Sequence, residues 1–119
     1  MNQKVLLVED DPTMRSLLKT FLELEGYQVF FADEEREETI LEYSNKLSPV
    51  ILILDVNLQQ ANGIDVLKKL RQEDQLSGVR ILMTSGLDVE QQCLDAGADG
   101  FLLKPYNPDE LINLLRRLS

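Results

Sequence analysis

Histidine is absent from this sequence of 119 residues, and cysteine occurs once, at Cys93. Without histidine, the chain has no imidazole for acid–base catalysis, for binding a metal or for carrying a phosphoryl group as phosphohistidine. A single cysteine excludes an internal disulfide framework and fits a reducing compartment such as the cytoplasm. We predict that Cys93 packs as a partly buried small hydrophobic residue without a redox role.

Long apolar runs and an excess of positive charge are also lacking. No apolar run approaches the roughly 20 residues that a membrane-spanning helix needs, and the residues before Lys4 lack the sections of a signal peptide. The 12 Lys and Arg against 21 Asp and Glu give a formal net charge of −9. Because a nucleic-acid backbone requires basic residues, this balance argues against direct binding to nucleic acid. These absences together predict a cytoplasmic protein without a membrane partner.

The length predicts one domain spanning residues 1–119. Hydrophobic residues make up 44% and charged residues 28% of the chain, which is ordinary for a soluble globular domain. Strand-like and helix-like patterns alternate five times along the sequence. The expected strands cover 4–8, 27–32, 50–54, 79–83 and 99–103, and the expected helices cover 12–25, 33–47, 63–74, 87–96 and 107–118.

Residues 50–54 form an unbroken apolar run, Val-Ile-Leu-Ile-Leu, which ends at the carboxylate of Asp55. A strand covered on one face alternates apolar and polar residues, whereas a strand covered on both faces need not. The run is therefore expected to be a central strand of a parallel sheet with helices on both faces. This pattern predicts an α/β, flavodoxin-like (βα)5 three-layer sandwich with the strand order 2-1-3-4-5 and a crevice between strands one and three.

Polar side chains follow four of the five expected strands, at the edge where the carboxyl ends of parallel strands meet. They are Glu9 and Asp10 after the first strand, Asp55 after the third, Thr84 after the fourth and Lys104 after the fifth. Three carboxylates repel one another unless a cation lies among them, and hard oxygen ligands without His or Cys suit Mg²⁺ (or Mn²⁺). Lys and Thr can bind phosphoryl oxygens, and a carboxylate can attack phosphorus to give an acyl phosphate. The combination indicates phosphoryl transfer.

Over its whole length the chain resembles the receiver domain of bacterial two-component response regulators. The matching features are the acidic pair, the phosphoacceptor, the switch hydroxyl, the switch aromatic and the Lys-Pro pair, which here are Glu9-Asp10, Asp55, Thr84, Phe101 and Lys104-Pro105. The resemblance also implies that the Lys104-Pro105 peptide bond is cis. Each feature alone is a weak signal, but their order along five strand ends makes the resemblance strong.

The loop after Asp55 departs from the family pattern. The segment from Asp55 to Gly63 is similar to the family's Asp-x-x-Met-Pro-x-x-x-Gly, with Leu58 in place of Met and Gln59 in place of Pro. We expect the missing proline to loosen this loop without removing a reactive group. Ser85 likewise stands where Ala or another small residue is usual in the family.

By this resemblance, Asp55 accepts a phosphoryl group from the phosphohistidine of a sensor histidine kinase or a phosphotransfer protein. Asp10, Asp55 and the backbone carbonyl of Asn57 would bind Mg²⁺ directly, and Glu9 would bind it through water. Lys104 would bind the phosphoryl group. On this view the chain is not an enzyme, because it catalyses only its own phosphorylation and dephosphorylation.

The resemblance also implies a conformational switch. Thr84 would move toward the phosphate and Phe101 would turn inward, with Lys104 and Pro105 completing the set of switch residues. The surface of the fourth helix, fifth strand and fifth helix would then change. This surface would contact an unknown output partner or output domain, or a second copy in a phosphorylation-dependent dimer. We expect Gly86, two residues after Thr84, neither to block nor to steer the hydrolytic water.

Other functions stay open on the residues alone. A degenerate receiver would keep the fold as a phosphorylation-independent interaction module, although the intact acid, Thr and Lys set argues against it. An aspartate-nucleophile phosphatase of the haloacid dehalogenase type would use Asp55, but it needs an acid where this chain has Asn57. A flavin carrier of the same topology needs a phosphate-binding loop where Glu9-Asp-Asp-Pro12 is acidic.

Several residues also have ordinary structural interpretations. Asp11 is expected to be a helix N-cap, and the acidic run 33–38 is expected to be a solvated helix start. Phe101 fits a buried core aromatic as well as it fits a switch.

Overall fold

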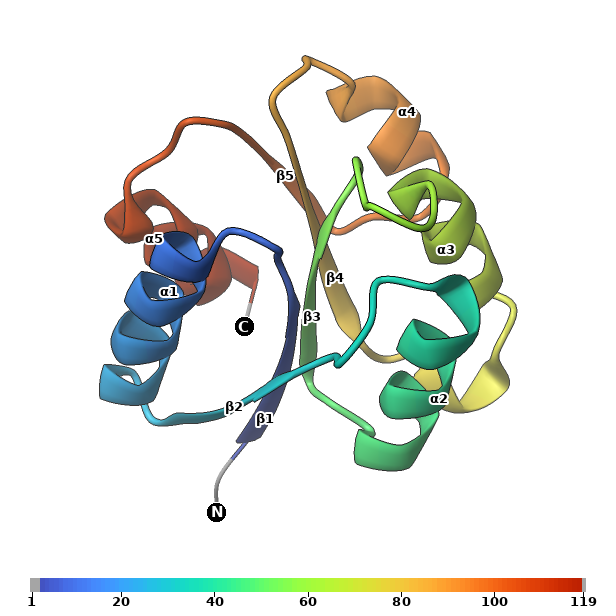
Figure 1. Ribbon diagram of the computed structural model, residues 1–119, viewed down its shortest axis with the longest axis horizontal. Helices are drawn as coiled ribbons and strands as arrows, with labels where there is room; N and C mark the ends of the chain where they lie inside the picture. Colours follow the sequence, from blue (N-terminus) through green and yellow to red (C-terminus); the bar gives the residue numbers. More distant parts are fainter. Residues whose placement is uncertain (1–2, 119) are drawn as a thin grey trace.

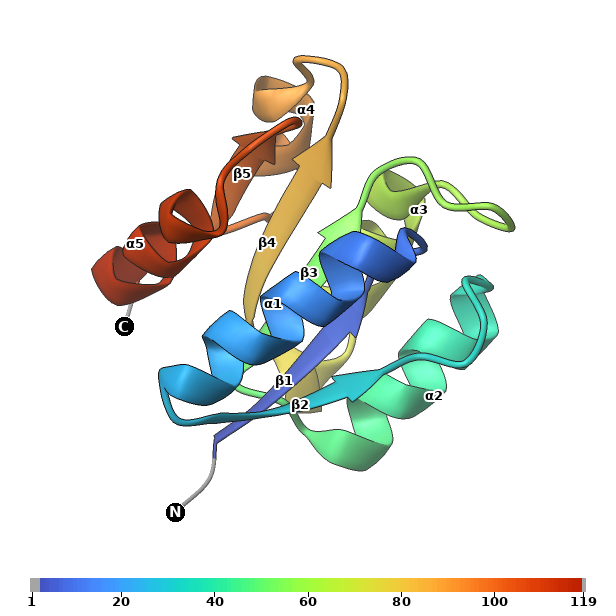
Figure 2. The same cartoon turned by 60° about the vertical axis from the view of Figure 1, so that its left-hand side comes forward.

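The computed structural model describes residues 3–118 and contains a five-stranded parallel sheet in the order β2-β1-β3-β4-β5, whose strands all point the same way (Figure 2). The strands are β1 (Gln3–Val8), β2 (Tyr27–Phe31), β3 (Ile51–Asp55), β4 (Arg80–Ser85) and β5 (Gly100–Leu103). The helices are α1 (Pro12–Leu24), α2 (Glu37–Leu47), α3 (Gly63–Leu70), α4 (Glu90–Asp95) and α5 (Pro108–Leu118), with the 3-10 turn η1 (Asp74–Leu76) before β4. The flavodoxin-like (βα)5 fold predicted from the sequence is confirmed. Residues 1–2 and 119 lie outside the described part of the chain. The expectation that the N-terminus lacks a signal peptide therefore falls mainly on residues that the structure does not describe.

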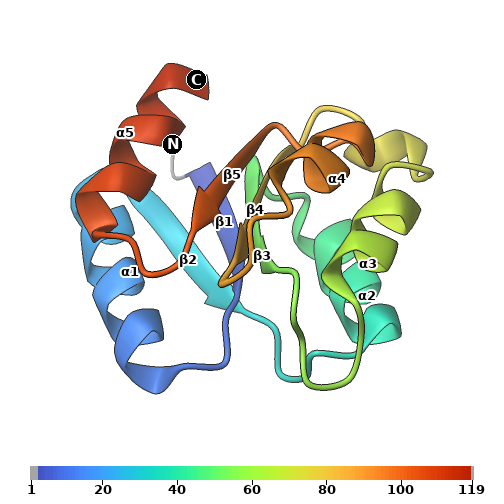
Figure 3. The same ribbon diagram turned by 90° about the horizontal axis from the view of Figure 1, so that it is seen from above.

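Helices cover both faces of the sheet, with α1 and α5 on one side and α2, α3 and α4 on the other (Figures 1 and 3). On the first face the core includes Leu18 of α1 and Leu111 of α5, both fully buried. On the second face it includes Ile40 of α2, Leu67 of α3 and Cys93 of α4. Every residue of β3 is buried, which explains why its sequence shows no polar alternation.

Local sequence sets where α1 and α3 begin. Asp11 is the N-cap of α1, and its carboxylate accepts a hydrogen bond from the Thr13 backbone N–H at 2.9 Å. Asn62 caps α3 in the same way. A Cβ on Gly63, the first residue of α3, would overlap the backbone carbonyl oxygen of Asp55. Only glycine therefore allows α3 to begin this close to the end of β3.

The second helix begins later than the sequence indicated. It starts at Glu37 rather than at residue 33, and Arg36 before it has extended backbone. Asp33 lies in the preceding loop, where its carboxylate accepts a hydrogen bond from the Tyr43 hydroxyl at 2.5 Å. Only Glu37 and Glu38 of the acidic run lie in the first helical turn, where the helix dipole favours negative charge.

The region around α4 also differs from the sequence-based expectation. Strand β4 continues through Thr84 and Ser85, which the sequence placed after the strand. The Ser85 side-chain oxygen accepts a hydrogen bond from the Leu87 backbone N–H at 3.0 Å, so the residues after β4 bend before α4 begins at Glu90. Cys93 of α4 is fully buried rather than partly buried, because this short helix packs it against the core.

Candidate functional site

The parallel register of the sheet gathers the predicted site residues at one edge. Val8 of β1 lies opposite Leu54 of β3, so the residues that follow them, Glu9 and Asp55, come level with each other. Asp55 is in turn the register partner of Thr84 in β4. The next strand, β5, joins the same edge through its following residue, since the Lys104 backbone N–H donates to the Ser85 carbonyl at 2.8 Å.

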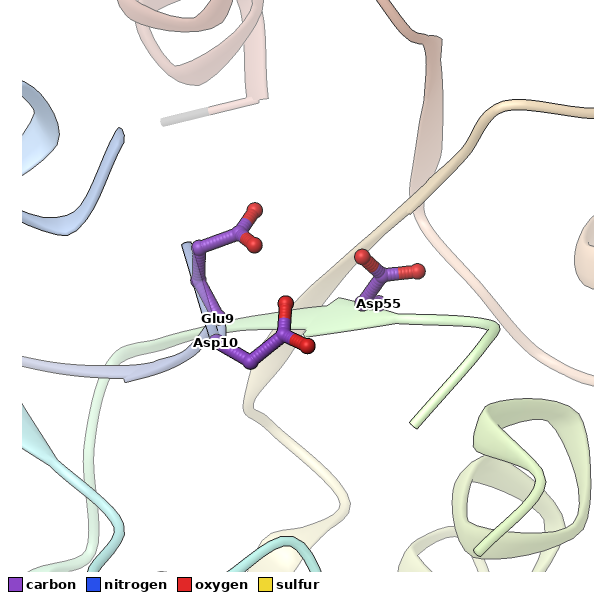
Figure 4. A group of neighbouring side chains, drawn as sticks. All are labelled: Glu9, Asp10 and Asp55. Atoms are coloured by element: carbon purple, nitrogen blue, oxygen red, sulfur yellow. The ribbon is translucent and has the colours of Figure 1, made fainter. Parts of the chain in front are cut away.

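Three carboxylates converge at this edge (Figure 4). Oxygen atoms of Glu9, Asp10 and Asp55 all lie within 4.8 Å of one another. Glu9 and Asp55 are each only 7% exposed, whereas Asp10 is exposed. In Figure 4 the Asp10 carboxylate is turned toward Asp55. A cluster of hard oxygen ligands that is open on one side fits a cation such as Mg²⁺, which keeps several waters when bound to protein.

Lys104 reaches between the two buried acids. Its Nζ lies 2.9 Å from Glu9 Oε1 and 2.5 Å from Asp55 Oδ2. Burial lowers the pKa of this ammonium, but hydrogen bonds and charge from Asp55 and Glu9 outweigh burial and raise the pKa above its ordinary value. Three carboxylates and one ammonium leave the cluster with two negative charges in excess (3 − 1 = 2), which a divalent cation would neutralise.

Backbone N–H groups hold the two buried carboxylates in place. The Asn57 N–H donates to Asp55 Oδ1 at 2.9 Å, and the Asp11 N–H donates to Glu9 Oε2 at 3.2 Å. Each buried acid therefore has one oxygen bound by backbone and the other by Lys104. These partners fix the orientation of both buried carboxylates.

Gln59 makes contacts that the sequence did not predict. Its backbone N–H donates to Glu35 Oε1 at 2.8 Å, and its side-chain Nε2 donates to Asp10 Oδ2 at 3.3 Å. A proline at this position could make neither bond. The loop after β3 is thus tied to the loop before α2, where the sequence led us to expect a looser loop. The missing proline was the only signal in the sequence that this position is unusual.

The predicted switch residues lie in different environments. Thr84 is 2% exposed and lies beside Asp55 in the sheet. Phe101 in β5 is partly buried and packs against the core of the α2–α4 face. The Lys104-Pro105 peptide bond is cis, as the family resemblance implied. The residue after it, Tyr106, is 6% exposed, and sequence reasoning did not single it out.

The arrangement provides each part that phosphoryl transfer to a carboxylate requires. Asp55 offers a carboxylate held by hydrogen bonds, and Lys104 places a cation in contact with it. Thr84 supplies a hydroxyl beside the nucleophile. The acid cluster can hold a cation that offsets the charge of an incoming phosphoryl group. There is little covalent work for other residues, because such reactions depend on positioning and charge.

The class of this protein follows from its flavodoxin-like sheet, from the three carboxylates that could hold a metal at the carboxyl edge, and from a match to a known family. The response regulator receiver domain family matches residues 5–116, and the chain belongs to that family. The transcriptional regulatory protein CpxR of Escherichia coli (strain K12) is 42% identical over 117 residues, which make up 97% of this chain and 48% of CpxR. The chain thus spans about half the length of this curated relative.

Solved structures agree with this assignment. The chemotaxis response regulator CheY4 of Vibrio cholerae matches with a TM-score of 0.89 and 30% identity over 100% of both chains. The receiver domain of the sensor histidine kinase PA1611 from Pseudomonas aeruginosa PAO1 matches in fold with a TM-score of 0.83 and 24% identity, over 98% of this chain and 97% of that one. That receiver has a magnesium ion coordinated in its active site cleft. Within residues 3–118 of the present chain, no helix has the length and apolar character needed to cross a membrane.

Proposed function

We propose that this chain is a phosphorylation-controlled switch in which Asp55 accepts a phosphoryl group from the phosphohistidine of a sensor histidine kinase or a phosphotransfer protein. The observation that carries the proposal is the contact of Lys104 Nζ with Asp55 Oδ2 inside a cluster of three carboxylates. A lysine paired with a surface acid is common, but this acid ends a fully buried strand and lies within 4.8 Å of two more acids.

In the transfer step, an Asp55 carboxylate oxygen attacks the phosphorus of the donor. The new O–P bond gives an acyl phosphate, while the P–N bond to the donor imidazole breaks and the nitrogen leaves with the electron pair and takes up a proton. Lys104 occupies Asp55 Oδ2 in the resting state, so its ammonium is already placed to move onto a phosphoryl oxygen. The Asn57 N–H keeps the other carboxylate oxygen oriented during this exchange.

The residues that would hold Mg²⁺ (or Mn²⁺) are Asp10, Asp55 and the Asn57 backbone carbonyl, with Glu9 acting through water. Asp10 suits a direct ligand because it is exposed and its carboxylate is turned toward Asp55 (Figure 4). Glu9, whose oxygens accept hydrogen bonds from the Asp11 backbone N–H and from Lys104, is given the indirect role by the family resemblance. When bound, the cation supplies positive charge to the phosphoryl oxygens. The magnesium ion in the PA1611 receiver, which has the same fold, supports this choice of metal.

Phosphorylation would change the conformation of the surface formed by α4, β5 and α5. Thr84 and Lys104 would bind the phosphoryl oxygens, and Phe101 would move further into the core from its partly buried position. The two-state equilibrium shifts because these contacts form in only one state. The relative CpxR is a transcriptional regulatory protein about twice as long as this chain, which supports an output domain or partner as the reader of this surface. A phosphorylation-dependent dimer through the same surface is the other form of output that we propose.

Labelling with a small phosphodonor tests this function. Phosphoramidate with Mg²⁺ should place a phosphoryl group on the wild-type chain, and removal of the cation with EDTA should prevent it. Asp55→Asn should abolish labelling, whereas the matched control Asp65→Asn, an exposed acid in the first turn of α3, should not change it. Labelling that persists in Asp55→Asn, or no labelling of the wild type, would favour a fixed interaction module instead.

A further inference from the structure

Tyr106 has a buried hydroxyl without a hydrogen-bond partner, two residues after Lys104. It follows Lys104-Pro105 in the connection between β5 and α5, and its ring packs into the core of the α1–α5 face. The residue is 6% exposed. Among the side chains of residues 3–118, its hydroxyl oxygen is the one buried polar atom without a hydrogen-bond partner. Buried polar groups are nearly always paired, so an unpaired one calls for an explanation.

The charges that act on the Tyr106 hydroxyl are those of Glu9, Asp55 and Lys104. Burial, which has the largest effect, and the carboxylates of Glu9 and Asp55 together raise the pKa of Tyr106 to about 12, against the opposing charge of Lys104. Glu9 has the largest effect among these charged groups. The hydroxyl therefore keeps its proton at neutral pH and is a hydrogen-bond donor within electrostatic reach of the acid cluster.

The acid cluster contains one carboxylate that phosphorylation would leave short of a donor. In the resting structure Glu9 Oε1 accepts from Lys104, and Glu9 Oε2 accepts from the Asp11 backbone N–H. A move of Lys104 from Glu9 to the phosphoryl group on Asp55 would break the first of these bonds. A buried carboxylate oxygen without a donor is costly, so a nearby donor would favour the phosphorylated state.

We propose that Tyr106 is a positioning residue for phosphoryl transfer, whose hydroxyl donates to the Glu9 carboxylate once Lys104 has moved from Glu9 to the phosphoryl group. The proposal rests on the function proposed above. The hydroxyl has no partner in the resting state and gains one in the phosphorylated state, so it contributes only to the second. A hydrogen bond that forms only in the phosphorylated state shifts the two-state equilibrium toward that state. A phenylalanine would fill the same space in the core without this effect.

The difference between the two states gives the proposal a signature that a purely structural tyrosine lacks. Without metal and phosphoryl group, Tyr106→Phe removes an unpaired buried hydroxyl and should leave the urea midpoint of unfolding unchanged or raised. With Mg²⁺ and beryllofluoride, which mimics the phosphoryl group, the same substitution removes a hydrogen bond to a charged acceptor. The affinity of the Tyr106→Phe variant for beryllofluoride should therefore be about tenfold lower than that of the wild type.

The experiment measures beryllofluoride binding by fluorine NMR in four variants, together with urea unfolding in EDTA. Tyr106→Phe is compared with wild type, and again in the background of Glu9→Ala. The control is Tyr27→Phe, since this tyrosine lies in β2 and packs against the same core. We expect the roughly tenfold loss with Glu9 present and no further loss once Glu9 is removed.

Two results would overturn the role of Tyr106. One is wild-type affinity in Tyr106→Phe, and the other is the same loss with and without Glu9. A wild-type chain that fails to bind beryllofluoride at all would instead overturn the proposed function, and the role of Tyr106 with it. The two failures are therefore distinguishable in one set of measurements.

Discussion

Replacing Asp10 by asparagine should stabilise the chain in the absence of a divalent cation. The substitution removes one charge and keeps an oxygen that can still accept the hydrogen bond from Gln59. Around Asp10, two carboxylates and one ammonium leave a net charge of one negative unit (2 − 1 = 1). Asp10→Asn thus relieves a repulsion between like charges.

The size of this effect follows from Coulomb's law. The carboxylate oxygens lie within 4.8 Å of one another, and at that separation two unit charges repel by about 1 kcal/mol in water and by about 3 kcal/mol at the effective dielectric of a protein surface. Asp10 is exposed, so the lower value applies. We expect Asp10→Asn to raise the free energy of unfolding in EDTA by about 1 kcal/mol.

Magnesium should reverse the order of the two proteins. At a concentration of 100 times the dissociation constant, a ligand that binds only the folded state stabilises it by about 2.7 kcal/mol. Wild type should gain this stability, whereas Asp10→Asn should gain little because a direct ligand is lost. Urea unfolding followed by far-ultraviolet circular dichroism gives both values, since the chain has no tryptophan to report by fluorescence. The reasoning is refuted if Asp10→Asn is less stable than wild type in EDTA, or if Mg²⁺ stabilises both proteins equally.

Three further substitutions test separate parts of the account. Lys104→Met should lower metal-free stability by about 2 kcal/mol, because two buried carboxylates lose their ammonium. Since the folded state raises the pKa of Lys104, the difference in stability from wild type should persist at neutral pH and shrink as the pH rises above the ordinary pKa of lysine. Urea unfolding measured across this pH range checks both expectations. Gly63→Ala should destabilise by more than about 2 kcal/mol in the same assay, because its Cβ would overlap backbone of Asp55 and Val56; near-wild-type stability would contradict the packing described. A Cβ on Gly86 meets no atom within 4 Å, so Gly86→Glu should change stability by less than about 0.5 kcal/mol while changing the lifetime of the acyl phosphate, measured by phosphorus NMR; an unchanged lifetime would remove the role given to Gly86.

The fold was predictable because its signals are local and agree with one another. The unbroken apolar run before Asp55 marked a strand covered on both faces, and the structure buries all of β3. The register of a parallel sheet then brings the residue after one strand beside the residue after the next. The convergence of Glu9, Asp55, Thr84 and Lys104 at one edge could be predicted for this reason, without any knowledge of side-chain conformations.

The contacts within the site were not predictable, because they depend on side chains meeting across loops. Nothing local indicates that Lys104 binds Glu9 as well as Asp55, or that Gln59 reaches both Asp10 and Glu35. The start of α2 was misplaced for a related reason. A run of acids favours a helix N-terminus, but it does not specify which residue caps the helix.

The unpaired hydroxyl of Tyr106 is another feature that could not be predicted from the sequence. In the sequence it is one aromatic residue after a Lys-Pro pair, and its ring alone would suit the core. Only the tertiary packing shows that its oxygen is buried and lacks a partner. Sequence patterns identify which residues are apolar, but the pairing of buried polar atoms is a property of the tertiary structure.

The central claim is that Asp55 itself carries the phosphoryl group. Borohydride reduces an aspartyl phosphate to homoserine, so treatment after incubation with phosphoramidate and Mg²⁺, followed by peptide mass spectrometry, identifies the residue directly. We predict homoserine at Asp55 in the wild-type chain, dependent on Mg²⁺, and none at Glu9 or Asp10. Reduction at another acid, or a peptide containing Asp55 that stays unchanged while the chain is labelled, would contradict the account.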